Sequence, residues 1–564
     1  MDILGGSMER KRALSKRVEE LTLDLVRIRS IVGTTDENQI SDAIYALFNQ
    51  MPYWQAHPNK LKQLPFINDP LGRSSVMVEM TGELRPNAKT VILIGHTDTV
   101  GISDYGDFKE LATEPGALKE VLKSLPLSDD IRADLESDDY LFGRGILDMK
   151  CGVAMIIAMM EDLSKRISEW EGNIIFCAVG DEEGNSGGML SFVPELIDKQ
   201  KEMGYDYQAC VDTDYVAPRY DDDNHRYIYI GTVGKLMPSF YIVGKETHVG
   251  QPFNGLDPTQ IAGAIILKIN KNIAYSDVVE GEVSLPPITL QHRDLKSEYS
   301  VQIARAVNLY FNYATHNSTP DQVMEKMLKA AYDAFYDVVC TINERYDIFC
   351  KASHIDTKLL PWKARVMSYD ELYEAVYAER GEELKQRIED LKLEMLGDTT
   401  IDERLFSQYL VEEVHNLWSD KDPVVIVYFS PPYYPHNYVK GDSDKERRLL
   451  ETVDAVVKKH KGRRPIINRK FYPYISDLSF VSAPSNERIA SLEKNMPAYG
   501  SRYTLPIEDM QKLSLPVVNI GPFGKDAHQF TERIEKEYSF KVVPTILYET
   551  VLELLKRDKP EQTL

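Results

Sequence analysis

The chain has 564 residues, too many for one ordinary hydrophobic core, so two or three domains are expected. Its net charge of −22 argues against binding to nucleic-acid backbones or to anionic membranes. Five cysteines, odd in number and without C-x-x-C spacing, favour a reduced cytoplasmic protein. No apolar run approaches the roughly 20 residues that a membrane span requires.

Helices and strands alternate over the first 215 residues or so. Apolar spacing predicts helices at 11–28, 40–48 and 151–163, and buried strands at 75–80, 90–95, 173–179 and 207–212. This alternation predicts an α/β domain with a mixed, mostly parallel sheet and helices on both faces.

The pattern changes near residue 230. Strands at 238–243, 287–291, 306–313 and 423–429, with helices at 258–272 and 321–347, predict an inserted α+β domain over 231–435. Residues 369–417 are charged and helical but hold no heptad, so we expect a helical elaboration within about 351–420 rather than a coiled coil. Elements at 445–460, 517–520 and 544–556 return to the first domain, which then comprises 1–230 and 436–564.

The strand TVILIG is followed by His96 and Asp98. Residues two apart on an extended backbone point the same way, and ligands in open α/β sheets gather at the carboxyl ends of strands. His96 is therefore a candidate metal ligand, and Asp98 a candidate partner of its second ring nitrogen. Alone the motif is common, and a capping Asp beside a satisfied core His is the alternative.

Acidic residues follow two further predicted elements. Asp148, in GRGILDMKCG, is either a helix N-cap or a carboxylate shared by two metals. Asp181, Glu182 and Glu183 directly follow the strand IIFCAV, where three carboxylates are costly unless cations are present. In metal-assisted hydrolysis one such acid binds metal and its neighbour takes a proton from water.

Two later segments complete the candidate set. In ACVDTDYV, Asp212 ends a strand and Asp214 follows two residues later, so either is a candidate ligand or a plain loop acid. His528, in GPFGKDAHQFTER, would supply the second imidazole of a two-metal site.

The order of these motifs, from His96 to His528, resembles the metal-dependent exopeptidase and deacylase family that includes carboxypeptidase G, aminoacylase, tripeptidase T and succinyl-diaminopimelate desuccinylase. The resemblance implies a zinc-exopeptidase-like catalytic domain, an inserted lid or dimerisation domain and a homodimer. It also implies two divalent metal ions. Zinc suits imidazole and carboxylate ligands best, with manganese or cobalt as alternatives.

The resemblance also implies a role for each ligand. His96 would bind the first metal with Asp98 orienting its ring, and Asp148 would bridge both metals, with a cis peptide bond to Met149. Asp212 would complete the shell of the first metal, with Asp214 in reserve.

The remaining roles concern the second metal and the reaction. Glu183 and His528 would bind the second metal, and Glu182 would be the general base. His248, in GKETHVGQPFNG, would reach the partner subunit's site and stabilise the oxyanion. A surface-loop histidine is the alternative.

The expected activity is hydrolysis of an amide or peptide bond in a small acyl- or peptidyl-amino acid, and the resemblance suggests an arginine-related substrate. Two departures leave substrate choice open: the lid strand NLYFNYAT lacks the Arg usual in the family, and an extra acidic loop lies at about 103–139. Alternatives are a metal-free relative that binds an amino acid or a protein, and a scaffold that uses the helical insertion.

Overall fold

The computed structural model describes residues 8–398, 400–460 and 464–557. Contacts divide the chain into two compact units. Unit 1 consists of Met1–Thr232, Asn437–Ala483 and Pro506–Leu564, and unit 2 of Val233–His436 and Pro484–Leu505. No helix among the described residues is long and apolar enough to cross a membrane.

Unit 1 is built on an eight-stranded mixed sheet. Its central strands β5 (Asn173–Val179), β3 (Lys89–His96) and β6 (Asp206–Asp212) are parallel neighbours. Continuous apolar runs suit strands that are covered on both faces, and every residue of β5 is buried. The sheet order is β1-β2-β5-β3-β6-β19-β7-β18, with β1 (Leu61–Pro65), β2 (Ser74–Thr81), β19 (Val517–Asn519), β7 (Arg226–Tyr229) and β18 (Ile466–Arg469) outside the centre.

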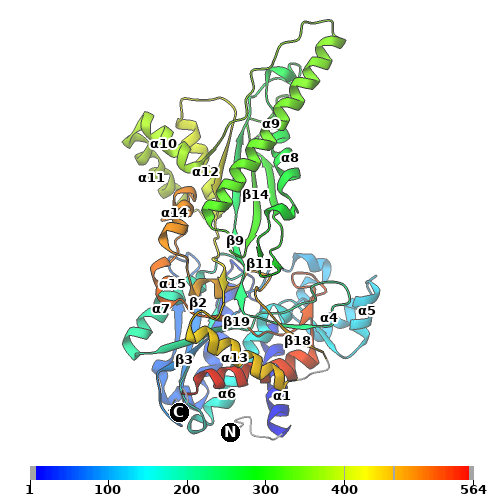
Figure 1. Ribbon diagram of the computed structural model, residues 1–564. Helices are drawn as coiled ribbons and strands as arrows, with labels where there is room; N and C mark the ends of the chain where they lie inside the picture. The colour runs from blue at the N-terminus through cyan, green and yellow to red at the C-terminus, as the bar shows by residue number, and fades with distance from the viewer. Residues whose placement is uncertain (1–7, 399, 461–463, 558–564) are drawn as a thin grey trace. The chain divides into compact units, whose positions relative to one another are not determined.

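Helices cover this sheet on both sides, as the alternation of elements predicted (Figure 1). The nearly all-apolar helix α6 (Cys151–Ser164) packs against α1 (Met8–Arg27) and β3. The helix α16 (Val543–Leu555) contacts β3 and β6, and α13 (Asp444–Lys459) packs on α16. The helix α2 (Asp36–Asn49) packs on β1 and β2, and α7 (Gly187–Met203) packs on β1 and β5. The short helix α3 (Pro52–Ala56) contacts α2, and α15 (Ile507–Leu513) contacts α7.

The expected acidic loop at about 103–139 is instead mostly helical. It contains the 3-10 segment η2 (Ser103–Leu111) and the helices α4 (Pro115–Leu122) and α5 (Asp129–Glu136). Tyr105, Leu118 and Leu135 form a small hydrophobic core of their own, which explains why a charged segment folds. Next to it, β4 (Tyr140–Phe142), β21 (Arg533–Glu535) and β20 (Gly524–Lys525) form a three-stranded sheet.

Unit 2 contains a second, mostly antiparallel sheet. Its order is β13-β14-β10-β16-β15, and β9 also pairs with β14. The helix α8 (Pro258–Ile269) packs on both β14 and the long helix α9 (Pro320–Ala352), which begins at a capping box on Thr319 (Figure 1). The strands are β13 (Ile288–Asp294), β14 (Ala306–Thr315), β10 (Pro238–Val243), β16 (Val424–Phe429), β15 (Val366–Ser368) and β9 (Gly234–Leu236).

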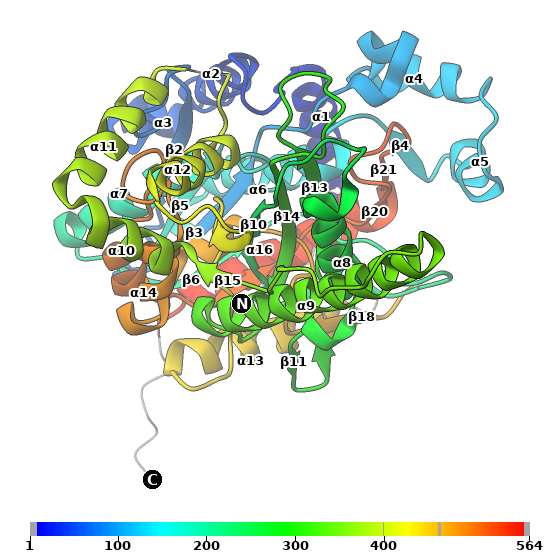
Figure 2. The ribbon, with the colours of Figure 1, turned by 90° about the horizontal axis from the view of Figure 1, so that it is seen from above.

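The expected helical elaboration is confirmed as three helices of unit 2. They are α10 (Tyr369–Arg380), α11 (Glu382–Leu396) and α12 (Glu403–Leu417), and each contacts the other two. A later segment of the chain joins them, because α14 (Asn486–Asn495) contacts both α10 and α9. Figure 2 shows α14 beside α10, although a return through unit 1 separates them in sequence.

Candidate metal centre

The predicted site residues of unit 1 gather at one edge of its sheet. His96 is the last residue of β3, Asp212 is the last residue of β6, and Glu182 follows the end of β5 by three positions. Because β5, β3 and β6 are adjacent and parallel, their carboxyl ends meet at the same edge. The alternation of strands and helices therefore brings distant acids and imidazoles into one place.

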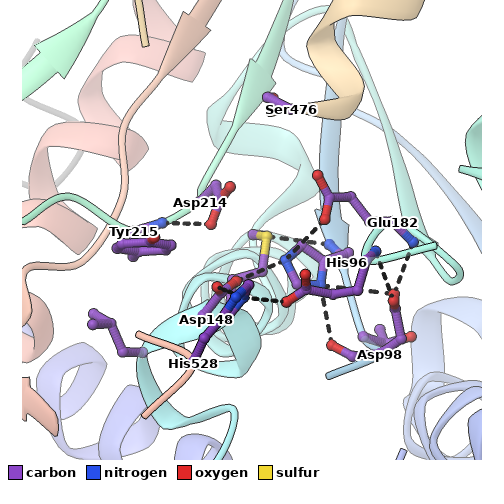
Figure 3. A network of polar contacts seen from close by, with 12 residues as sticks. His96, Asp98, Asp148, Glu182, Asp214, Tyr215, Ser476 and His528 are labelled. Atoms are coloured by element: carbon purple, nitrogen blue, oxygen red, sulfur yellow. Dashed lines mark hydrogen bonds and ion pairs between the residues drawn. The ribbon is translucent and has the colours of Figure 1, made fainter. Parts of the chain in front are cut away.

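Asp148 lies between two imidazoles (Figure 3). Its Oδ1 is 2.9 Å from Nε2 of His96, and its Oδ2 is 3.0 Å from Nε2 of His528. The same nitrogen of His528 is 2.8 Å from Oε1 of Glu183. Ligand atoms of His96, Asp148 and Glu183 all lie within 4.8 Å of one another. The two oxygens of one carboxylate thus face two different histidines, the arrangement expected of a bridging ligand.

The segment that carries Asp148 is held by a buried carboxylate. Gly145 precedes it with φ of 73°, where a Cβ would meet Thr99 at 2.5 Å. The backbone N–H groups of Leu147 and Asp148 donate to Oε1 of Glu532 at 3.1 and 3.3 Å. The peptide bond between Asp148 and Met149 is cis, as the family resemblance implied.

Strong negative potential surrounds the two histidines. Burial opposes ionisation of Asp148, but hydrogen bonds from His528 and His96 hold the pKa of its carboxyl well below its usual range. Burial likewise opposes a charge on His528, yet Asp148 and Glu183 raise its pKa to about 11. A site that favours positive charge at these nitrogens also favours a divalent cation there. The donor set of imidazoles and carboxylates therefore fits divalent metal ions such as zinc.

Glu182 points toward this cluster but makes a looser contact with it. Its Oε2 is 3.9 Å from Nε2 of His96, and its side chain is 9% exposed. Burial raises the pKa of its carboxyl well above the ordinary value, and the charge of Glu183 adds to that rise while His96 opposes it. A buried carboxyl with a raised pKa, next to ligands but not bonded to them, suits a proton carrier.

Asp98 joins two of the converging segments. Its carboxylate accepts the backbone N–H groups of Glu182 at 3.2 Å and of Glu183 at 3.0 Å. Nδ1 of His96 lies 3.1 Å from the carbonyl oxygen of Asp98 and 3.7 Å from its carboxylate. The carboxylate thus fixes the loop after β5 to the end of β3, besides facing the ring of His96.

The two acids after β6 have different surroundings. Asp212 accepts hydrogen bonds from the N–H of Thr213 at 2.7 Å and from the hydroxyl of Ser476 at 2.8 Å. Asp214 accepts the N–H of Tyr215 at 2.7 Å. Burial raises the pKa of Asp214 well above its ordinary value, and the charge of Asp148 is the next largest cause. Figure 3 shows the hydrogen bond between Asp214 and the N–H of Tyr215 in the same view as Asp148.

His248 belongs to unit 2. Its ring nitrogen Nδ1 accepts the backbone N–H of Gly250 at 3.0 Å, and the residue is exposed on its loop. The ring is therefore accessible to a ligand.

Sequence reasoning missed several buried partners of the cluster. Glu532 accepts a hydrogen bond from Arg144 at 2.9 Å, and both side chains are almost fully buried. Asp477 is fully buried, and its charge contributes to the raised pKa of Glu182. The spacing GRG before Asp148 and the Glu four residues after His528 were visible in the sequence. Their pairing was not, since 388 positions separate Arg144 from Glu532.

Comparison with known sequences agrees with this geometry. Residues 92–553 match the sequence model of Peptidase family M20/M25/M40. Protein RocB of Bacillus subtilis (strain 168) is 34% identical over 545 residues, which cover 96% of this chain and 95% of that protein. Succinyl-diaminopimelate desuccinylase of Wigglesworthia glossinidia brevipalpis is 24% identical over 261 residues, covering 45% of this chain and 61% of that protein.

Comparison with solved structures concerns the fold alone. Aminopeptidase PepT from Bacillus cereus ATCC 10987 has a TM-score of 0.50 at 13% identity, covering 96% of this chain and 99% of that one. The di-peptidase Dug1p from Saccharomyces cerevisiae has a TM-score of 0.50 at 12% identity, covering 99% and 100%. The expected fold class is confirmed.

Proposed function

Because the chain belongs to Peptidase family M20/M25/M40, we propose that it is a metal-dependent hydrolase of an amide or peptide bond in a small acyl- or peptidyl-amino acid. One observation carries the proposal: the two oxygens of Asp148 face His96 and His528 separately, with Glu183 bonded to the second histidine. The proposal assigns two divalent ions to this cluster, with zinc preferred over manganese and cobalt.

The proposed ligands divide between two ions. His96 and Asp148 would hold the first, and Asp148, Glu183 and His528 the second. For the remaining position on the first ion we favour Asp214 over Asp212. Both carboxylates accept hydrogen bonds, but the charge of Asp148 is, after burial, the largest cause of the raised pKa of Asp214, which indicates that Asp214 lies close to the bridging ligand. Metal analysis of Asp212→Asn and Asp214→Asn distinguishes them, because only loss of the true ligand weakens binding of the first ion.

Two metal ions bound there would polarise the scissile carbonyl and lower the pKa of the attacking water. Glu182 would accept the proton of that water and deliver it to the leaving amine, since its buried carboxyl lies beside the ligands without bonding to them. Asp98 would keep Glu182 in place through the backbone N–H that it accepts. His248, from the partner copy, would donate a hydrogen bond to the oxyanion.

A homodimer formed through unit 2 would bring His248 to the partner's site. The edge strand β13 supports this proposal, because it exposes 51% of Leu290 and 37% of Ile288, and nearby Leu267 on α8 is 88% exposed. Light scattering of the purified protein should give twice the chain mass, and Leu290→Lys should shift it toward the monomer. A monomeric wild-type protein would remove the partner-subunit role of His248.

The activity is tested by a substrate screen on metal-loaded protein. Dipeptides and N-acyl amino acids, including N-acyl derivatives of arginine, are incubated with protein loaded with zinc, manganese or cobalt, and amine release is measured. We expect turnover that a chelator abolishes and that added metal restores. A zinc content near zero per chain after zinc loading would instead support the alternative, a metal-free relative that only binds its ligand.

A further inference from the structure

The loop between β5 and α7 carries both Glu182 and Glu183, and we call residues 180–186 the acid loop. Its first acid, Asp181, adopts φ of 64°, the left-handed region that Asp tolerates better than most residues. The carboxylate of Asp181 accepts the N–H groups of Asn185 at 3.3 Å and Gly187 at 3.0 Å. Asp181 therefore folds the acid loop back on itself and does not face the metal cluster.

Arg73 is the cation that faces Asp181. Its Nη1 is 2.7 Å from Oδ1 of Asp181 and 2.7 Å from Oε1 of Glu37. The other oxygen of Glu37 accepts the backbone N–H of Asp181 at 2.9 Å. The outer side of the guanidinium is held by Asp69, which accepts from Nη2 at 2.9 Å. The side chains of these four residues are between 3% and 10% exposed, so water screens the charges little.

The acid loop is thus fixed from two directions. From the side of β3, Asp98 accepts the N–H groups of Glu182 and Glu183. From the side of β2 and α2, Arg73 and Glu37 hold Asp181. Arg73 is a buried cation that contacts the buried carboxylates of Glu37, Asp69 and Asp181. Burial opposes its charge, but Asp69, Asp181 and Glu37 raise the pKa of its guanidinium overall.

We propose that Arg73 is a positioning residue, which places the carboxylates of Glu182 and Glu183 by clamping Asp181 and Glu37. The inference rests on the proposed function, because it concerns the geometry of that reaction. A guanidinium is suited to the task, since its planar fork reaches three carboxylates at once, whereas an ammonium does not reproduce that geometry. A displacement of the acid loop by about 1 Å would reduce turnover by roughly 100-fold.

A matched pair of variants tests the clamp. Asp181→Asn and Asp69→Asn each remove one negative charge from the same guanidinium, but only Asp181 bonds to the acid loop. We expect kcat of zinc-loaded Asp181→Asn to fall by about 10- to 100-fold with KM changed less than about threefold. Asp69→Asn should lower kcat clearly less than Asp181→Asn does, because Nη1 of Arg73 keeps its bonds to Asp181 and Glu37. Arg73→Lys should behave like Asp181→Asn.

A second readout does not depend on activity. Amide hydrogen exchange of Asn185 and Gly187 should be faster in Asp181→Asn and Arg73→Lys than in Asp69→Asn or Arg226→Lys. Arg226 is another buried arginine of unit 1, and it pairs with Glu535 rather than with a residue of the acid loop, so it controls for loss of a buried ion pair. Zinc affinity should fall in the same order, because Glu183 would be displaced.

The outcomes separate the clamp from the proposed function. If wild-type protein hydrolyses none of the substrates, the function fails, and amide exchange and zinc affinity still decide the clamp. The clamp would be refuted if Asp181→Asn and Asp69→Asn changed amide exchange and zinc affinity equally, or if neither variant changed them. Equal effects would mean that the ion pairs of Arg73 only stabilise the fold.

Discussion

Replacement of Glu182 by Gln tests the proposed chemistry most directly. The change keeps the shape of the side chain and removes its charge and proton affinity. Oε2 of Glu182 lies 3.9 Å from Nε2 of His96, whereas Oδ1 of Asp148 lies at 2.9 Å, so the variant removes no ligand. The N–H of residue 182 still bonds to Asp98. Loss of a general base lowers turnover by about 10²–10⁴-fold, or roughly 3–5 kcal/mol in activation free energy.

The assay compares kcat for amine release with metal content measured on the same preparation. Glu182→Gln should bind both ions and turn over at least about 100-fold more slowly. The adjacent Glu183→Gln is the matched control, because Oε1 of Glu183 lies 2.8 Å from His528, and this variant should lose one equivalent of metal. Full activity of Glu182→Gln, or loss of metal from it, would refute the assignment of the base.

Further expectations concern the ligands, their support and the second unit. His96→Ala should lose the first ion, which metal analysis of the purified variant would measure, and added zinc should not restore its activity. Glu532→Ala leaves Arg144 without its buried partner and should lower stability by about 3–5 kcal/mol in urea unfolding. His248→Ala should reduce kcat by roughly 10²–10³-fold without changing metal content or stability, since the side chain is exposed. Burial lowers the pKa of His415 to about 4, so this residue binds a proton more readily in the unfolded chain between about pH 6.5 and 4. As the pH falls through that window, the free energy of unfolding of wild type should therefore drop by about 3 kcal/mol more than that of His415→Leu.

Much of unit 1 was predictable because its signals are local. The apolar runs of β3 and β5 mark buried strands, and parallel neighbours bring their ends together wherever they lie in the chain. Adjacent acids directly after such a strand therefore indicate the site. His96 and Glu183 were predicted to lie in one cluster because the carboxyl ends of neighbouring parallel strands meet at one edge of a sheet.

Other features depend on long-range pairings that no local pattern contains. Arg73 lies 108 positions before Asp181, and its Gly-Arg-Ser context resembles an ordinary turn before a strand. Three adjacent carboxylates after a buried strand predict nearby cations, and for Asp181 the structure places the guanidinium of Arg73 there. The segment 484–505 has a composition like that of its neighbours, so no sequence pattern predicts that it packs with unit 2.

The order of the segments also affects how the protein is made. Three residues of the central cluster, His96, Asp148 and Glu183, are synthesised before unit 2, whereas His528 and the strand β19 follow it. A nascent chain that has emerged only as far as unit 2 lacks β19 of the sheet and His528 of the cluster. On the proposed assignment, the second metal site would therefore be complete only after the inserted unit has been synthesised.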